Sequence, residues 1–139
     1  MLKNIFNTSH SGLTDAGLLI LRLAVGILML THGIPKLLNF SQLVEAGTFL
    51  PVLGSATLGL SLAIFAEVLM SLFLIAGLFT RIATLPLIVT MLVAAFVAHA
   101  GDPFSSKEPA LLYLFPYIAI LLAGPGKYSL DNVIGRMRK

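Results

Sequence analysis

The chain has 139 residues, of which 58% are hydrophobic and only 11% are charged, and its formal net charge is +3. A soluble domain carries about 25% charged residues, so this composition, with a mean hydropathy of +0.98, argues against a soluble protein and predicts a single-domain integral membrane protein. The absence of cysteine excludes disulfides, a thiol nucleophile and cysteine-ligated metals. The basic residues do not form a patch interleaved with aromatics, so no nucleic-acid partner is expected.

The first apolar stretch predicts an uncleaved membrane helix at residues 15–35, close to the roughly 20 residues that a span requires. Arg22 interrupts the stretch, and it ends in His32-Gly33-Ile34-Pro35 where a signal peptide would carry a small-residue cleavage site. An arginine inside an apolar helix costs roughly 2.5–3.5 kcal/mol on insertion scales, so Arg22 should face protein or a wet cavity.

Three further membrane helices are predicted, at residues 55–79, 82–98 and 109–123. Residues 37–53 are too broken by polar residues and proline to span, so we expect an interfacial or partly re-entrant loop there. Residues 100–108 are predicted to form a short polar loop, and residues 124–139 a basic tail. The predicted fold class is therefore an all-α, antiparallel four-helix membrane bundle that occupies residues 1–139 as one domain.

The distribution of basic residues predicts the orientation of this bundle. With four helices, both termini and the turn at Arg81 lie on the same side of the membrane. That side carries Lys3, Arg81, Lys127, Arg136, Arg138 and Lys139, whereas the other side carries Lys36 and Lys107. By the positive-inside rule, both termini are expected in the cytoplasm.

Glu67 is the one charged residue of the second predicted helix and lies near its middle. Side chains on a helix lean toward its N-terminus, so Glu67 leans toward the outer face while His32 and His99, on helices of opposite direction, lean toward Glu67. Lys36 follows His32 by one helical turn. We therefore predict a polar pocket in the outer half of the bundle, with Glu67 as the candidate proton-handling group.

The substrate-binding candidates at this pocket are Arg22, His32, Lys36 and His99. Arg22 lies about 8 Å on the cytoplasmic side of Glu67 and leans away from it, so a direct Arg22–Glu67 ion pair is only a competing hypothesis. Burial disfavours a charged carboxylate, and we therefore expect Glu67 to be protonated and to donate a hydrogen bond.

Each of these residues also has an ordinary structural interpretation. Arg22 could snorkel to the inner interface, and Glu67 could form a hydrogen bond that only joins two helices. The two histidines and Lys36 could be plain interfacial residues. Two histidines and a carboxylate could ligate a metal, but they lie on separate helices without a short ligand spacing, so no metal site is predicted. Asp102 and Glu108 fall in the same outer half of the bundle and are interpreted as loop residues.

The sequence resembles the DoxX family of small four-helix membrane proteins. The matching pieces are RLxxGxxxxxHGxxKL at 22–37, Glu67, GLFTRIA at 77–83, His99 and GPGKYSLD at 124–131. The chain departs mildly from the family at Met29 and Leu30, where relatives often carry phenylalanine. The resemblance implies a multi-pass protein of the bacterial inner membrane.

The resemblance also implies a function. Some family members look like the membrane subunit of a thiosulfate:quinone oxidoreductase, and others are associated with quinone or catechol detoxification or with oxidative stress. We therefore predict a redox subunit that binds a quinone or a similar small apolar molecule, with Glu67 handling protons, His32 and His99 bonding to ring oxygens, and Arg22 or Lys36 stabilising negative charge. Whether the chain itself is an enzyme is left open.

No haem, iron–sulfur or nucleotide-binding motif is found in the sequence, so no intrinsic cofactor is predicted and quinone is the expected ligand. Electrons would then come from a soluble redox partner or dioxygenase, or the substrate would arrive already reduced. Membrane lipid and a second copy of the chain are further expected partners. The alternative functions are a non-catalytic membrane scaffold or assembly factor, and a small transporter or proton path through Glu67.

Overall fold

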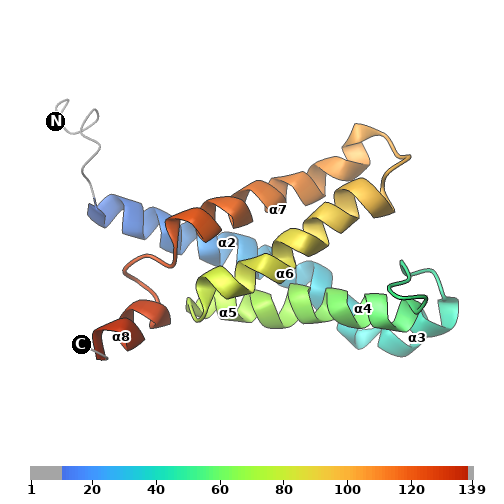
Figure 1. Ribbon diagram of the computed structural model, residues 1–139, viewed down its shortest axis with the longest axis horizontal. Helices are drawn as coiled ribbons and strands as arrows, with labels where there is room; N and C mark the ends of the chain where they lie inside the picture. Colours follow the sequence, from blue (N-terminus) through green and yellow to red (C-terminus); the bar gives the residue numbers. More distant parts are fainter. Residues whose placement is uncertain (1–10, 138–139) are drawn as a thin grey trace.

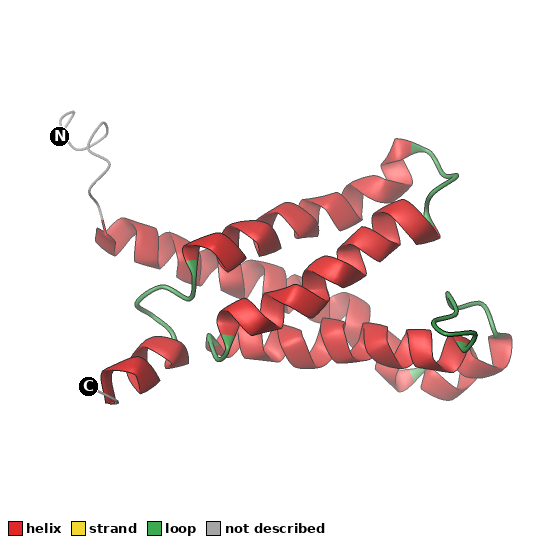
Figure 2. Cartoon of the chain, in the orientation of Figure 1, coloured by secondary structure: helices red, strands yellow, loops and turns green. Residues whose placement is uncertain are grey.

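The protein is described here by a computed structural model, which covers residues 11–137. These residues form helices joined by short loops, as Figure 2 shows. In chain order the helices are α2 (Ser11–Leu38), α3 (Phe40–Ala46), α4 (Ala56–Ile64), η1 (Phe65–Met70), α5 (Ser71–Ala76), α6 (Thr80–Val93), η2 (Ala94–Ala98), α7 (Phe104–Ala123) and α8 (Leu130–Met137).

Within residues 11–137, four helical segments are long and apolar enough to cross a membrane. These spans are Gly12–Leu38, Ala56–Ala76, Thr80–Ala98 and Phe104–Ala123. The predicted all-α membrane bundle is therefore confirmed. Large apolar side chains such as Ile20, Leu112 and Leu122 are 65–74% exposed, which is the surface that lipid would cover.

The four spans alternate in direction, so that short connections gather at the two ends of the bundle (Figure 1). One end contains the start of α2, the α5–α6 turn and α8; we call it the α8 end. The opposite end, which we call the α3 end, contains α3, the loop that follows it and the α6–α7 loop. The predicted polar residues His32, Lys36 and His99 belong to segments that finish at the α3 end.

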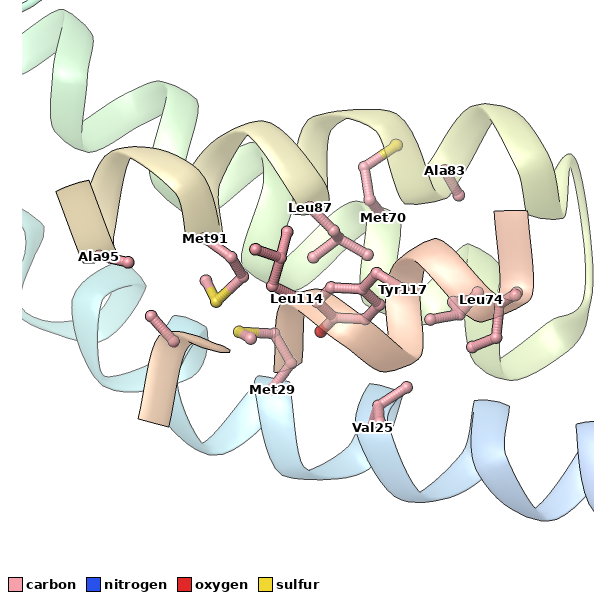
Figure 3. Close-up of a cluster of buried hydrophobic side chains, with 12 residues drawn as sticks. Val25, Met29, Met70, Leu74, Ala83, Leu87, Met91, Ala95, Leu114 and Tyr117 are labelled. Atoms are coloured by element: carbon pink, nitrogen blue, oxygen red, sulfur yellow. The ribbon is translucent and has the colours of Figure 1, made fainter. Parts of the chain in front are cut away.

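The core between the spans is apolar and tightly packed. Tyr117 of α7, Met29 of α2 and Leu87 of α6 are at most 1% exposed and point toward one another (Figure 3). Leu74 and Leu114 extend the same cluster along the bundle. Lipid tails are as apolar as this core, so hydrophobic burial does not drive the helices together in a membrane. Close van der Waals contacts between the packed side chains stabilise helix association instead.

Two of the spans change from α-helix to π-helix along their length, which the sequence did not predict. η1 contains Glu67, and η2 ends one residue before His99. A π-helical turn accommodates one extra residue and shifts the side chains that follow it, and such turns are frequent at functional sites. Both candidate side chains therefore lie where the helical register changes.

Glycines set the distance between α2 and the second span. A β-carbon on Gly33 would lie 2.9 Å from Glu67 Cβ and 3.0 Å from the Glu67 carbonyl carbon. A β-carbon on Gly26 would lie 2.6 Å from Ile75 Cγ1. The two helices thus approach as closely as they do because small residues stand at the crossing.

The α8 end is held by a polar network centred on Arg22, which is 1% exposed. Its guanidinium donates to the carbonyl oxygens of Pro125 and Tyr128, in the loop that leads to α8. Asp131, in the first turn of α8, accepts hydrogen bonds from the backbone N–H groups of Phe79 (2.7 Å) and Thr80 (2.9 Å). Asp131 thereby caps the N-terminus of α6 from another part of the chain.

Several predicted boundaries were wrong. The first helix does not end at residue 35 but continues through Gly33 and Pro35 to Leu38, because Pro35 removes only one backbone N–H donor and the residues after it still close the last turn. The last span begins at Phe104 rather than at residue 109, so most of the predicted polar loop 100–108 is helical. The segment 37–53 contains the short helix α3, and the predicted tail contains α8.

Replacing Gly33 with alanine tests the close helix crossing. The added methyl group has no room against Glu67, so Gly33→Ala should lower the stability of the protein by about 1–3 kcal/mol, the usual cost of overpacking. The measurement is the thermal unfolding midpoint in mild detergent. Gly17→Ala is the matched control, because a β-carbon on Gly17 would meet nothing within 4 Å, and it should be neutral or slightly stabilising. Equal midpoints for the two variants would contradict the crossing geometry.

Candidate functional site

Glu67 and Lys36 form an ion pair at the α3 end of the bundle. The Lys36 Nζ lies 2.6 Å from both Glu67 carboxylate oxygens, Oε1 and Oε2. The Glu67 side chain is 4% exposed and the Lys36 side chain 28%. Both oxygens accept from the Lys36 ammonium, so the hydrogen bonds of Glu67 differ from the donor role that the sequence predicted.

The ion pair arises because α2 continues one turn farther than the sequence predicted. Gly33 brings the backbone of α2 against Glu67, and Lys36 then follows three residues later on the neighbouring part of the helix. A buried carboxylate is costly unless it is paired, and the Lys36 side chain supplies the pairing by reaching the Glu67 carboxylate with its ammonium. The competing Arg22–Glu67 pair does not form.

Arg22 does not belong to the candidate site. Its guanidinium bonds to the Pro125 and Tyr128 carbonyls at the α8 end, and Arg22 lines neither of the pockets beside Glu67. The prediction that Arg22 binds substrate therefore does not fit its position. The snorkelling interpretation fails as well, because the side chain is buried under the loop that follows α7 rather than extended to the interface.

A pocket of about 270 Å³ opens beside the ion pair. It is bounded by α2, η1, the α6–η2 span and α7. Its lining residues are Met29, His32, Lys36, Glu67, Met91, Ala94, His99, Ser106, Pro109, Ala110 and Tyr113. The structure thus brings His32, Lys36, Glu67 and His99 to one cavity, as the leaning of their side chains predicted. We call this cavity the polar pocket.

A second pocket of about 310 Å³ lies on another side of the same ion pair and shares Lys36, Glu67, Ala94 and His99 with the polar pocket. Its other walls are mostly apolar and come from the loop after α3, from α4 and from α6. The Lys36 ammonium stands 5.9 Å from the centre of the Phe49 ring in this wall. We call this cavity the apolar pocket.

Two tyrosines of α7 were not identified as site residues from the sequence: Tyr113, which lines the polar pocket, and Tyr117, which stacks on Tyr113. The ring of Tyr113 meets His32 edge-on with centroids 5.6 Å apart, and stacks on Tyr117 with centroids 6.2 Å apart. The Tyr117 hydroxyl is buried without a hydrogen-bond partner in the described part of the chain. The i, i+4 spacing of the two tyrosines on α7 was the available signal, since it places both on one helix face.

Asp102, which the sequence placed among the polar residues of the outer half and interpreted as a loop residue, lines neither pocket but contacts the site through His99. Its Oδ2 lies 2.7 Å from His99 Nδ1. Glu108, by contrast, is exposed and lines neither pocket.

Over residues 11–137, no three histidine, aspartate or glutamate side chains cluster as metal ligands would.

Comparison with known protein families shows which family the chain belongs to. Residues 17–100 match the model of the DoxX family, and this range contains Arg22, His32, Lys36, Glu67 and His99. The chain belongs to the DoxX family. An uncharacterized protein of Haemophilus influenzae is 34% identical over 119 residues, which cover 81% of this chain and 86% of that protein. No solved structure matches the chain. In this DoxX protein the matched range supplies the whole ion pair, and Asp102 and Tyr113 lie just beyond it.

A double-mutant cycle on Lys36 and Glu67 tests the ion pair. Lys36→Met leaves a buried carboxylate without a partner, so it should destabilise the protein by a few kcal/mol, toward the low end of the roughly 3–5 kcal/mol typical of a broken buried pair because Lys36 is partly exposed. Adding Glu67→Gln should recover part of that loss, since the buried group is then neutral. The measurement is thermal unfolding of both single variants and the double variant. Additive losses would show that the two side chains do not interact.

Proposed function

We propose that this DoxX protein is the membrane subunit of a redox system and binds a quinone or a similar small apolar ring compound in the polar pocket. The observation that supports the proposal is that three spans deliver His32, Lys36, Glu67 and His99 to one cavity of about 270 Å³. Ligand pockets are typically about 300–1,000 Å³ and mostly apolar with a few polar groups, so this one suits a single small ring.

Each lining group has a role in this proposal. His32 and His99 hydrogen-bond to ring oxygens, and Tyr113, which lies against His32, provides an aromatic surface for the ring. The Lys36–Glu67 pair handles protons: a ligand oxygen that gains negative charge draws the ammonium, and the released carboxylate can accept a proton. Met29 and Met91 close the apolar side of the pocket with polarisable, adaptable side chains.

The electrons must pass through another molecule. With no electron carrier of its own among the sequence motifs, the subunit would work beside a soluble redox protein or a dioxygenase, or receive a ligand that is already reduced. Turnover would then be a property of the complex, and a second copy of the chain is a further partner in this proposal. The apolar pocket, on the other side of the ion pair, offers space for an alkyl substituent of the ligand.

Ligand binding to the purified protein in lipid nanodiscs tests the proposal. The probe is decylubiquinone, titrated by calorimetry against nanodiscs with and without protein. We expect saturable binding of about one molecule per chain. Ser106→Phe should weaken the binding about tenfold or more, because Ser106 lines the polar pocket and the larger ring occupies part of it.

The matched control is Ser105→Phe. Ser105 precedes Ser106 on α7 but is exposed and lines neither pocket, so this variant should bind the probe as the wild type does. Equal weakening by both variants would point to general disturbance of α7. No saturable binding to folded wild-type protein would overturn the ligand proposal and favour a membrane scaffold.

We further propose that the protein lies in the bacterial inner membrane with the α8 end in the cytoplasm. The charge distribution supports this orientation, because Arg81, Lys127 and Arg136 all belong to segments at that end. A phosphatase reporter that is active only in the periplasm should be silent when fused after Lys139 and active when inserted in the α6–α7 loop after Gly101. The reverse pattern would overturn the orientation.

A further inference from the structure

His99 is held by an aspartate at the mouth of the polar pocket. Its ring Nδ1 lies 2.7 Å from Asp102 Oδ2, and the backbone N–H of Asp102 donates to the His99 carbonyl at 3.2 Å. This tight turn after η2 fixes the carboxylate beside the ring. The two side chains are 43% and 49% exposed, so the pair stands between the pocket and the aqueous end of the bundle.

This contact decides which ring nitrogen carries the proton. An ionised carboxylate can only accept hydrogen bonds, so Nδ1 must be the protonated nitrogen. In a neutral imidazole the other nitrogen, Nε2, is then an acceptor. A carboxylate partner sets histidine tautomers in the same way in metal sites and catalytic triads.

Among the described residues, no other group that lines the polar pocket is a histidine held by a carboxylate. Both Glu67 oxygens accept from Lys36, and the Lys36 ammonium can only donate. The His32 ring is packed edge-on against Tyr113, and Lys107, on the α7 side, donates to the Ala100 carbonyl rather than to Asp102. Among the described residues, His99 therefore offers the polar pocket a histidine nitrogen of defined acceptor character.

We propose that the polar pocket selects a ligand whose ring carries a hydroxyl group, a phenol or the reduced hydroquinone form, over a ring with only carbonyl or ether oxygens. Asp102 is the positioning residue, because it acts through the tautomer of His99. This inference rests on the proposed function, since it assumes that the polar pocket holds a small ring. To the proposed function, the inference adds the chemical form of the ligand: a ring hydroxyl that donates a hydrogen bond to His99 Nε2.

Two ligands that differ in a single donor test this selectivity without redox chemistry. The probes are 4-pentylphenol and its methyl ether, 4-pentylanisole, titrated into the full chain in nanodiscs at pH 8, where an ordinary histidine is neutral. The quantity compared is the ratio of the two dissociation constants. Comparing that ratio between variants cancels the difference in how the probes partition into lipid.

Asp102→Ala removes the carboxylate and releases the ring to its other tautomer. We expect the preference for the phenol to fall about three- to tenfold relative to wild type, which is the worth of one hydrogen bond. Glu108→Ala is the control: it removes an exposed carboxylate from the start of α7, at the same end of the bundle, and should leave the ratio unchanged. An unchanged ratio in Asp102→Ala would overturn the proposal.

Nitrogen-15 NMR of histidine-labelled protein tests the tautomer independently of any ligand. The His99 signals, assigned by their loss in His99→Gln, should show a protonated Nδ1 and an unprotonated Nε2 at pH 8 in wild type and in Glu108→Ala. Asp102→Ala should shift them toward the Nε2-protonated form. A wild-type ring protonated at Nε2 would also overturn the proposal.

The two measurements separate this inference from the proposed function. Binding of neither ring compound to folded protein would overturn ring binding in the polar pocket, and the selectivity with it. Equal binding of both compounds, with the same ratio in wild type and Asp102→Ala, would overturn the selectivity alone and leave the pocket as a ring-binding site.

Discussion

The buried carboxylate of Glu67 imposes the main constraint on this structure. A charge in the middle of a membrane bundle must have a partner, and Lys36 provides it from one turn beyond the glycine that lets the two helices meet. The pairing requires that α2 continue through Pro35 and that the second span approach it closely. Because both pockets share Lys36 and Glu67, the same pair also forms their common wall.

Arg22, which is buried, and Lys36, which is partly exposed, serve different purposes because they lie at opposite ends of the bundle. Arg22 binds backbone carbonyls of the loop before α8, and Asp131 of α8 caps the N-terminus of α6. These contacts join residues 77–83 to residues 124–131 next to Arg22. This network holds the α8 end, and Arg22 itself lines neither the polar pocket nor the apolar pocket. At the α3 end the Lys36–Glu67 ion pair has a pocket on each of two sides, which leaves room for a ligand there.

The π-helical segments explain how the polar side chains reach the pocket from spans that are otherwise apolar. η1 carries Glu67 and η2 ends before His99, so each shifts its residue relative to a regular α-helix. His99 then begins the tight turn that returns Asp102 to its ring. A regular helix would aim these side chains differently, so the local geometry of two spans is tied to the chemistry of the polar pocket.

The amino-acid sequence by itself determined the fold class, the four spans, the family and the gathering of His32, Lys36, Glu67 and His99 at one end, because hydropathy and helix periodicity are local and the membrane restricts the architecture. Only the tertiary structure decided the partners. Glu67 pairs with Lys36 because of a glycine crossing, and Arg22 is bound by a loop more than 100 residues away along the chain. Tyr113 and Asp102 enter the site through interhelical packing and a turn. The contacts between helices depend on distances between segments, which no residue pattern within one segment encodes, whereas Asp102 reaches His99 within one local turn.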